Sequence, residues 1–332
     1  MTISAGESFD TATELAPVAG EGKVIEGRSL GQLAWARLRK DKVAMAGGVV
    51  SLILILIAIS AWPLTWLGWI HPNDSNSDAL NIANSMPAGS FGGVTWEHPF
   101  GVDPQLGRDI MDRVIVGLQT SLSIALAATV LAIVVGVTVG VLAGFFGGWV
   151  DAVLARIMDI LLAFPVLLFS IALLVILRTI GEIGPLAGNT LSYVALVAII
   201  GGFGWAYPAR IIRGQALSLR EKEFVEAARS LGARNGRIVF KELLPNLVAP
   251  ILVYATLLLP VNILVEAGLS YLGVGLNPPT ASLGQMIDQA SRVMRIDPTY
   301  LLIPGVTIFI TVLAFNLFGD GLRDAIDPKS SR

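Results

Sequence analysis

Six long apolar runs alternate with polar segments along the 332 residues of the chain. The runs cover residues 43–62, 114–146, 157–177, 193–213, 247–270 and 301–318. A helix needs about 20 apolar residues to cross the roughly 30 Å hydrocarbon core of a bilayer, and each run is near or above that length. The pattern predicts an all-α integral membrane protein with six transmembrane helices.

The polar segments complete the predicted organisation. The expected parts are a disordered cytoplasmic tail at 1–29, an interfacial helix at 30–42, a first transmembrane helix at 43–69, an external loop at 70–112, a five-helix core at 113–320 with a cytoplasmic loop at 214–245, and a cytoplasmic tail at 321–332. Leu30, Leu33, Ala34 and Leu38 recur at helical spacing beside basic residues, which favours a helix lying in the interface. A solvated stretch without fixed structure is the alternative there.

Composition and charge agree with a membrane protein and predict its orientation. The chain is 54% hydrophobic and 14% charged, which is more apolar surface than one soluble core could hide. If the amino terminus is cytoplasmic, 18 of the 23 lysines and arginines fall on the inner side. Because cytoplasmic loops carry an excess of Lys and Arg, we expect both termini to be cytoplasmic.

Small residues repeat every fourth position along the second apolar run. They are Ala128, Ala132, Gly136, Gly140, Gly144 and Gly148. Small residues in one register let the backbone of another helix approach closely, so Gly136, Gly140 and Gly144 are predicted helix-packing positions. The alternative is that glycine is simply frequent in membrane helices.

The sequence lacks the patterns that common catalytic sites require. No phosphate loop of the form GxxxxGK[ST] is present, and neither is HExxH or GxSxG. The absence of cysteine and the presence of only two histidines exclude cysteine sites and histidine-rich metal sites. No basic patch alternates with aromatic residues, as a nucleic-acid surface would require. We therefore expect no catalytic residue, cofactor or metal in this chain, and no nucleic-acid partner.

Several polar residues outside the loops allow more than one interpretation. Glu266 lies late in the fifth run and either lines a translocation path or fixes a helix end by hydrogen bonding. Arg156 and Asp159, three residues apart, suggest a local ion pair. In the outer motif HPFGVDPQLGRD, the glycines and proline favour a turn-rich cap over a metal site. Arg108 and Asp109 would then bond to the local backbone or to each other.

The most informative segment is EFVEAARSLGARNGRIVFKELLPN, which separates the fourth and fifth apolar runs. Its charged residues are Glu223, Glu226, Arg229, Arg234, Arg237, Lys241 and Glu242. Each would cost roughly 2.5 to 3.5 kcal/mol at the centre of a bilayer. The segment therefore lies in water, and its helical pattern is typical of a surface that binds another protein.

This segment resembles the EAA loop of binding-protein-dependent ABC importer permeases, through EAARSLG at 226–232 and through Leu244 and Pro245. From about Leu30 onward the chain also resembles the C-type permease subunit of dipeptide and oligopeptide importers. Similar stretches include HPFGVDPQLGRDIMDRVIVGLQTSL, EAGLSYLGVGLNPPTASLGQMI and LAFNLFGDGLRDAIDP. Glu242 departs from the family pattern, which has an apolar residue there, so no role is transferred to it.

The resemblance implies a type I ABC importer permease fold, similar to MetI. Two short helices would meet at Gly232, with Glu226, Ala227 and Ala228 on the first arm, and this arm would enter a groove of an ATPase subunit. Its apolar side would include Phe224, Val225, Ala228 and Leu231.

The resemblance also implies the partners and the solute. The partners would be a second homologous permease, two ATPase subunits or domains that hold ATP and Mg, and an extracytoplasmic substrate-binding protein. Peptides are the expected solute, and nickel, haem or an opine are alternatives within the family. A secondary transporter is a further alternative, but the span centres are nearly free of the charges that ion coupling needs.

Overall fold

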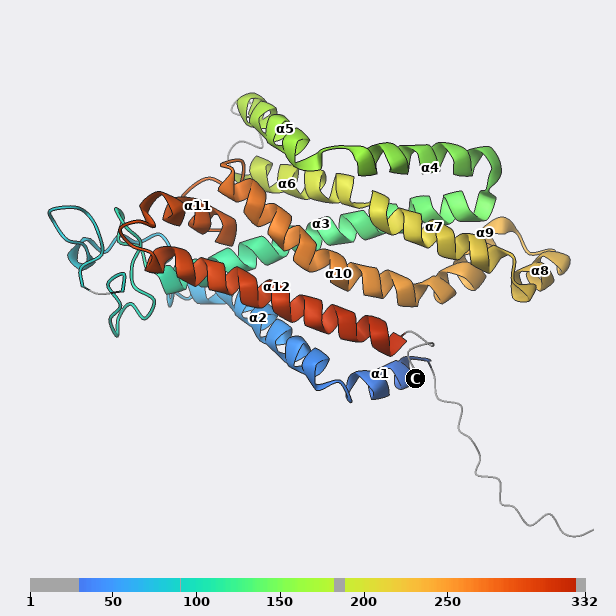
Figure 1. Cartoon of the computed structure of the whole chain (residues 1–332), viewed down its shortest axis with the longest axis horizontal. Helices are drawn as coiled ribbons and strands as arrows, with labels where there is room; N and C mark the ends of the chain where they lie inside the picture. Colours follow the sequence, from blue (N-terminus) through green and yellow to red (C-terminus); the bar gives the residue numbers. More distant parts are fainter. Residues whose placement is uncertain (1–29, 90, 182–188, 327–332) are drawn as a thin grey trace, which may run out of the picture.

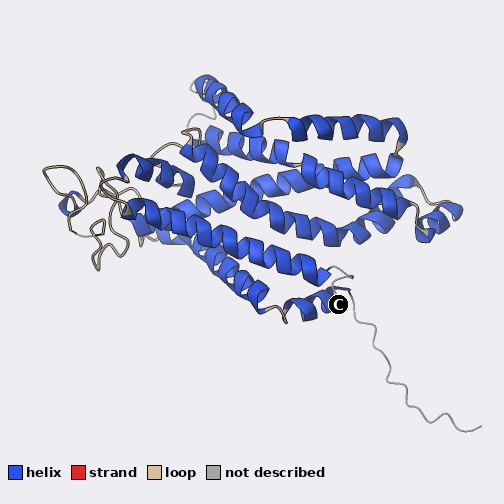
Figure 2. Cartoon of the chain, viewed as in Figure 1, coloured by secondary structure: helices blue, strands red, loops and turns tan. Residues whose placement is uncertain are grey.

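The computed structural model describes residues 30–89, 91–181 and 189–326, and it contains helices and no β-strand over these ranges (Figures 1 and 2). Five helices are long and apolar enough to span a membrane, or six if one bent pair counts as a single span. The prediction of an all-α membrane protein is confirmed. The tail predicted at 1–29 and residues 327–332 lie outside the described residues.

The long helices run lengthwise between two dissimilar ends (Figure 1). One end, here called the loop end, carries the segment between α2 and α3 together with α11. The other, here called the elbow end, carries α8, α1 and the end of α12. The helices are α1 (Leu30–Leu38), α2 (Lys42–Trp66), α3 (Ile110–Phe146), α4 (Gly148–Ala163), α5 (Val166–Gly181), α6 (Asn189–Gly204), α7 (Ala206–Arg220), α8 (Glu223–Ser230), α9 (Asn235–Arg237), α10 (Leu244–Tyr271), α11 (Leu283–Val293) and α12 (Thr299–Ile326), with a 3-10 turn η1 (Ser77–Ala79) and a π-helical turn η2 (Ile238–Leu243).

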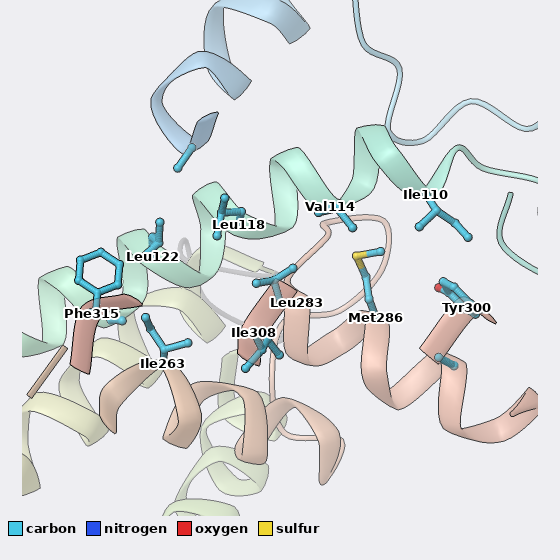
Figure 3. Packing of buried hydrophobic residues seen from close by; sticks show 13 residues of the cluster. Ile110, Val114, Leu118, Leu122, Ile263, Leu283, Met286, Tyr300, Ile308 and Phe315 are labelled. Carbon is cyan, nitrogen blue, oxygen red and sulfur yellow. The ribbon is translucent and has the colours of Figure 1, made fainter. Parts of the chain in front are cut away.

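α3 is the central helix of the bundle and contacts α2, α4, α6, α7 and α10. Near the loop end its side chains Val114, Leu118 and Leu122 face residues of α10, α11 and α12 (Figure 3). Ile263 and Phe315 belong to the same buried cluster. Since hydrocarbon gives helices little hydrophobic reason to associate, this close packing has to hold the bundle together.

The third predicted span, 157–177, is not one straight helix. α4 ends at Ala163, α5 begins at Val166, and the two axes differ by 81°. Phe164 between them is extended, with φ −81° and ψ 136°, because the proline that follows it disfavours the helical conformation. Pro165 also lacks the backbone N–H that a continuous helix would use.

The carboxyl-terminal region differs from the prediction in two places. α12 continues to Ile326, although a tail was expected from residue 321. It remains helical because its last turns pack on α1 and α2: Gly321 lies against Ala44, and Ala325 is buried beside Leu38. α11 was not predicted either, because its amphipathic pattern is too short to resemble a membrane span.

Near the amino end, the predicted interfacial helix 30–42 ends early. The Asp41 carboxylate accepts hydrogen bonds from Val43 N (2.9 Å) and Ala44 N (3.1 Å), which starts α2 at Lys42. Exposed tryptophans lie toward both ends of the bundle: Trp62 and Trp66 are in the last turns of α2, which ends near the loop end, and Trp149 is in the first turn of α4, which begins near the elbow end (Figure 1). Aromatic residues at two levels are typical of the two membrane–water interfaces.

Candidate functional site

The elbow, defined here as residues 223–243, extends beyond the ends of α7 and α10 (Figure 1). α8 ends in a turn at Gly232, whose φ is +78°. Gly232 N donates to Arg229 O at 2.9 Å, and Ala233 N donates to Ala228 O at 3.0 Å. This pair of bonds is a Schellman motif, which needs a left-handed residue and therefore favours glycine. The sequence thus folds into two arms at the predicted position.

Buried apolar side chains attach the elbow to the bundle. Val225 of α8 and Ile238 of η2 are fully buried, and they pack with Phe145 of α3 and Ala216 of α7. The guanidinium carbon of Arg229 lies 5.7 Å from the centre of the Phe145 ring, within the range of a cation–π contact. The elbow therefore packs directly on α3 and α7.

The exposed side of the elbow differs from the predicted one. Val225 is fully buried against the bundle and is not available to a partner's groove, and Ala228 packs on the same cluster but stays partly exposed. Phe224 of α8 and Leu231, which directly follows α8, remain exposed, and Leu231 is 89% exposed. Phe240 of η2 is 71% exposed and was missed because one aromatic residue in a charged segment gives no periodic signal. Positions 225 and 228 share a face three residues apart, and that face meets the bundle.

The remaining predicted coupling residues have distinct surroundings. Glu226 and Ala227 are exposed on α8. Leu244 packs inward with neighbours that include Leu247, whereas Pro245 is exposed at the start of α10. Because Pro245 cannot donate a backbone hydrogen bond, the preceding turn is free to widen into the π-helical η2.

Two ion pairs join α4 to α7 between the elbow end and the middle of the bundle. Arg213 donates to both oxygens of Asp151, the Nη2 bond being 2.8 Å long, and Arg210 pairs with Asp159. The predicted pairing of Asp159 with Arg156 is wrong. α7 lies alongside α4 and brings Arg210 to this carboxylate, a contact that spacing within one helix cannot reveal.

The predicted glycine positions lie where α3 crosses α7. A Cβ atom at Gly140 would lie 2.6 Å from Ala209 O, and one at Gly144 would lie 2.7 Å from Arg213 O. At Gly136 the nearest atom would be Trp205 O, at 2.9 Å. The backbones approach so closely that no side chain fits between them.

Glu266 lies in a buried hydrogen-bond network between α3, α10 and α11. Its carboxylate accepts bonds from Ser121 Oγ and Ser270 Oγ, both at 2.8 Å, and Ser121 Oγ accepts one from Leu283 N at 3.1 Å. Glu266 is fully buried, and it does not line the side cavity described below. These bonds near the end of α10 fit the alternative interpretation, in which Glu266 fixes a helix end by hydrogen bonding, and its role in a translocation path stays a prediction.

A side cavity of about 590 Å³ opens between α4, α5, α6, α7, α10 and α12. Its polar lining residues are Ser170, Tyr207, Tyr254, Asn262, Asn316 and Arg323. The rings of Tyr207 and Tyr254 meet edge to face, with centroids 6.1 Å apart. The sequence analysis did not predict this site. One signal for it was present, because Asn316 and Arg323 are seven residues apart and so place two polar side chains on one face of the mainly apolar α12.

The outer motif forms the turn-rich cap that its glycines predicted. Gly101 and Gly107 have φ of +78° and +67°, and the Asp109 carboxylate accepts a bond from Asp112 N at 3.0 Å. His98 Nδ1 lies 2.7 Å from Asp109, and Arg108 pairs with Asp103 instead of with Asp109. Over the described ranges, no cluster of three potential metal-binding side chains is present.

Comparisons with known proteins identify relatives of most of the chain. The family model described as binding-protein-dependent transport system inner membrane component matches residues 136–332. The model described as N-terminal TM domain of oligopeptide transport permease C matches residues 29–87. The glutathione transport system permease protein GsiD of Salmonella typhimurium is 43% identical over 299 residues, which is 89% of each chain. GsiD of Shigella flexneri serotype 5b is 42% identical over 297 residues, again 89% of each chain.

Solved structures show the same fold at lower sequence identity. A chain of the MetNI methionine ABC transporter in an inward-facing conformation has a TM-score of 0.52 and 22% identity. It matches over 66% of this chain and 98% of its own length. A second crystal form gives a TM-score of 0.50 and 21% identity over the same shares. The described helices thus have the fold of a type I ABC importer permease.

Proposed function

Because this chain belongs to the family of binding-protein-dependent transport system inner membrane components, we propose that its elbow transmits force from an ATPase subunit to the membrane helices. The chain is a membrane-spanning permease subunit of an ABC importer, and its relatives are bacterial. ATP and Mg would be bound by two partner ATPase subunits or domains, since the sequence has no phosphate loop.

One observation carries this proposal: the elbow packs on the bundle with one side and carries exposed apolar side chains on the other. Val225 and Ile238 fix it to α3 and α7, while Phe224, Leu231 and Phe240 are exposed. Exposed aromatic and leucine side chains on a short helical elbow suit docking into an apolar groove. The acidic and basic side chains around them would contact the polar rim of such a groove.

The elbow end would be the cytoplasmic end of the molecule. α1 and the carboxyl-terminal end of α12 lie at the same end as α8 (Figure 1). The excess of Lys and Arg in the segments at this end supports the same orientation. The loop end would then face an extracytoplasmic substrate-binding protein.

The side cavity would form this subunit's half of the translocation path. A second, homologous permease packing over α5 and α10 would complete its wall. The lining combines apolar side chains with tyrosine, asparagine and arginine side chains, and it therefore suits a solute with both apolar and polar groups. We infer a small peptide as the solute, in line with the glutathione named for the GsiD relatives.

Cysteine crosslinking tests the docking of the elbow. The natural chain contains no cysteine, so a single Ala227→Cys substitution gives an unambiguous attachment point. With the ATPase subunits co-expressed, we expect a crosslink from this cysteine to an ATPase, and we expect its yield to change when ATP is trapped. Ile82→Cys at the loop end, where Ile82 is fully exposed, is the matched control and should not crosslink to the ATPase.

The same two variants test the orientation. A membrane-impermeant maleimide added to intact spheroplasts should label Ile82→Cys and leave Ala227→Cys unlabelled. Labelling of Ala227→Cys from outside would contradict the orientation. A complex assembled at normal yield with no crosslink from residue 227 would contradict docking at the elbow.

A further inference from the structure

A second polar cavity, here called the outer cavity, has a volume of about 370 Å³ and lies at the loop end. The 103–108 turn, residues 273–278, α11 and the start of α12 form its wall. Its charged lining residues are Asp103, Arg108, Asp288 and Arg292, and its amide residues include Gln285 and Gln289. Two stretches that carried the family resemblance, beginning at His98 and Glu266, meet here, although neither contributes to the elbow.

Beside this cavity two buried arginines share one carboxylate. Arg108 donates to Asp103 from its backbone N at 2.8 Å and from Nε at 2.7 Å. Arg113 is fully buried, yet its Nε lies 4.0 Å from the same carboxylate and has no hydrogen-bond partner over the described ranges. Its terminal nitrogens donate to neutral oxygens of residues 72, 73 and 285. Asp103, Arg108 and Arg113 together carry a net charge of +1, and a buried charge without a partner is costly.

The arginines also fix the orientation of two glutamine amides. Gln285 Oε1 accepts from Arg113 Nη2 at 3.2 Å, and Gln289 Oε1 accepts from Arg108 Nη2 at 3.3 Å. A guanidinium can only donate, so each glutamine must turn its oxygen toward the arginine and its amide nitrogen elsewhere. Gln285 is 4% exposed and lines the cavity, and its Nε2 has no partner in the part of the chain that the structure describes. Gln285 Nε2 is thus a buried hydrogen-bond donor without an acceptor among the described residues.

We propose that the outer cavity binds a carboxylate group, which accepts a hydrogen bond from Gln285 Nε2 and provides the negative charge that the two arginines lack. The other charged pair at the wall is balanced, because Arg292 donates to Asp288 at 2.8 Å. Cavities of roughly 300 to 1,000 Å³ hold small organic ligands, so there is room for more than a bare ion. The carboxylate belongs either to a free small peptide or to an acidic side chain of the docked binding protein.

Ligand-observed NMR on the transporter complex in nanodiscs tests the first source. The probe is glycylglycine, and its control is glycylglycine amide, which has nearly the same size and no carboxylate. We expect glycylglycine to bind and the amide to bind weaker by about tenfold or more.

Gln285→Glu is the matched variant. It keeps an oxygen for Arg113 and replaces the unpaired donor by a carboxylate, which should repel the ligand. We expect glycylglycine binding to fall by about tenfold or more, with the thermal midpoint at or above that of the natural chain. Asn84→Asp makes the same chemical change at an exposed loop residue and should alter neither quantity.

The second measurement is the docking of the substrate-free binding protein, and this arm rests on the proposed function. If glycylglycine does not bind but Gln285→Glu weakens docking by about tenfold, the carboxylate comes from the binding protein. If Gln285→Glu changes neither glycylglycine binding nor docking, the proposal is overturned. Failure of the transport proposal would instead appear as a missing crosslink at residue 227.

Discussion

Replacement of Gly140 by alanine measures how closely α3 and α7 are packed. The added Cβ would lie 2.6 Å from Ala209 O, whereas ordinary contact begins at 3.4 Å, so the backbones would have to separate by about 0.8 Å. Ile212 Cβ and Arg213 N, at 3.0 and 3.1 Å, leave little room for a sideways shift. Overpacking of this kind costs about 1 to 3 kcal/mol.

Gly214→Ala on α7 is the matched control. No atom lies within 4 Å of its new Cβ, and the residue is exposed. Both substitutions replace a helical glycine and share the gain in helix propensity of up to about 1 kcal/mol. The difference between the two variants therefore isolates the packing contribution.

The assay is reversible unfolding in mixed micelles with a rising fraction of dodecyl sulfate, followed by tryptophan fluorescence. We expect Gly140→Ala to have a lower free energy of unfolding than Gly214→Ala by about 1 to 3 kcal/mol. Gly140→Leu should lose more and should lower the yield of assembled complex. Equal stability of the two alanine variants would refute the packing argument.

Three further changes have defined outcomes. In Gly232→Ala the new Cβ meets no atom within 4 Å, but a residue with a side chain must adopt φ +78°, which strains the backbone by about 1 to 2 kcal/mol. We expect uptake to fall while membrane abundance, measured by immunoblot, stays constant. Asp103→Asn leaves Arg108 and Arg113 buried without a carboxylate, so the free energy of unfolding in the micelle assay should fall by about 3 to 5 kcal/mol. An unchanged unfolding transition would contradict the pairing. Glu266→Gln keeps an acceptor for the two serine hydroxyls and should retain near-normal uptake and abundance, whereas Glu266→Leu leaves them without a partner and should lower abundance. Loss of uptake in a stable Glu266→Gln variant would favour a role of Glu266 in the translocation path.

Local sequence patterns determined the membrane helices and the turn of the elbow. Long apolar runs have one stable form in hydrocarbon, because a helix satisfies its backbone hydrogen bonds within its own segment. The turn at Gly232 depends on a glycine and on bonds to residues three to five positions away. Both features are local, so the sequence contains all the information needed to predict them.

Contacts between distant segments decided the rest. Whether Val225 or Leu231 is exposed to a partner depends on how α8 packs on α3 and α7. The spacing of apolar residues shows only that the two side chains lie on different faces, and it does not say which face is buried. Asp159 pairs with Arg210 because a neighbouring helix brings it near, and Glu266 is buried because α3 and α10 meet there. The outer cavity likewise exists only where segments more than 150 residues apart meet around Arg108 and Gln289. Such contacts follow from packing in three dimensions, which residue spacing along one helix does not encode.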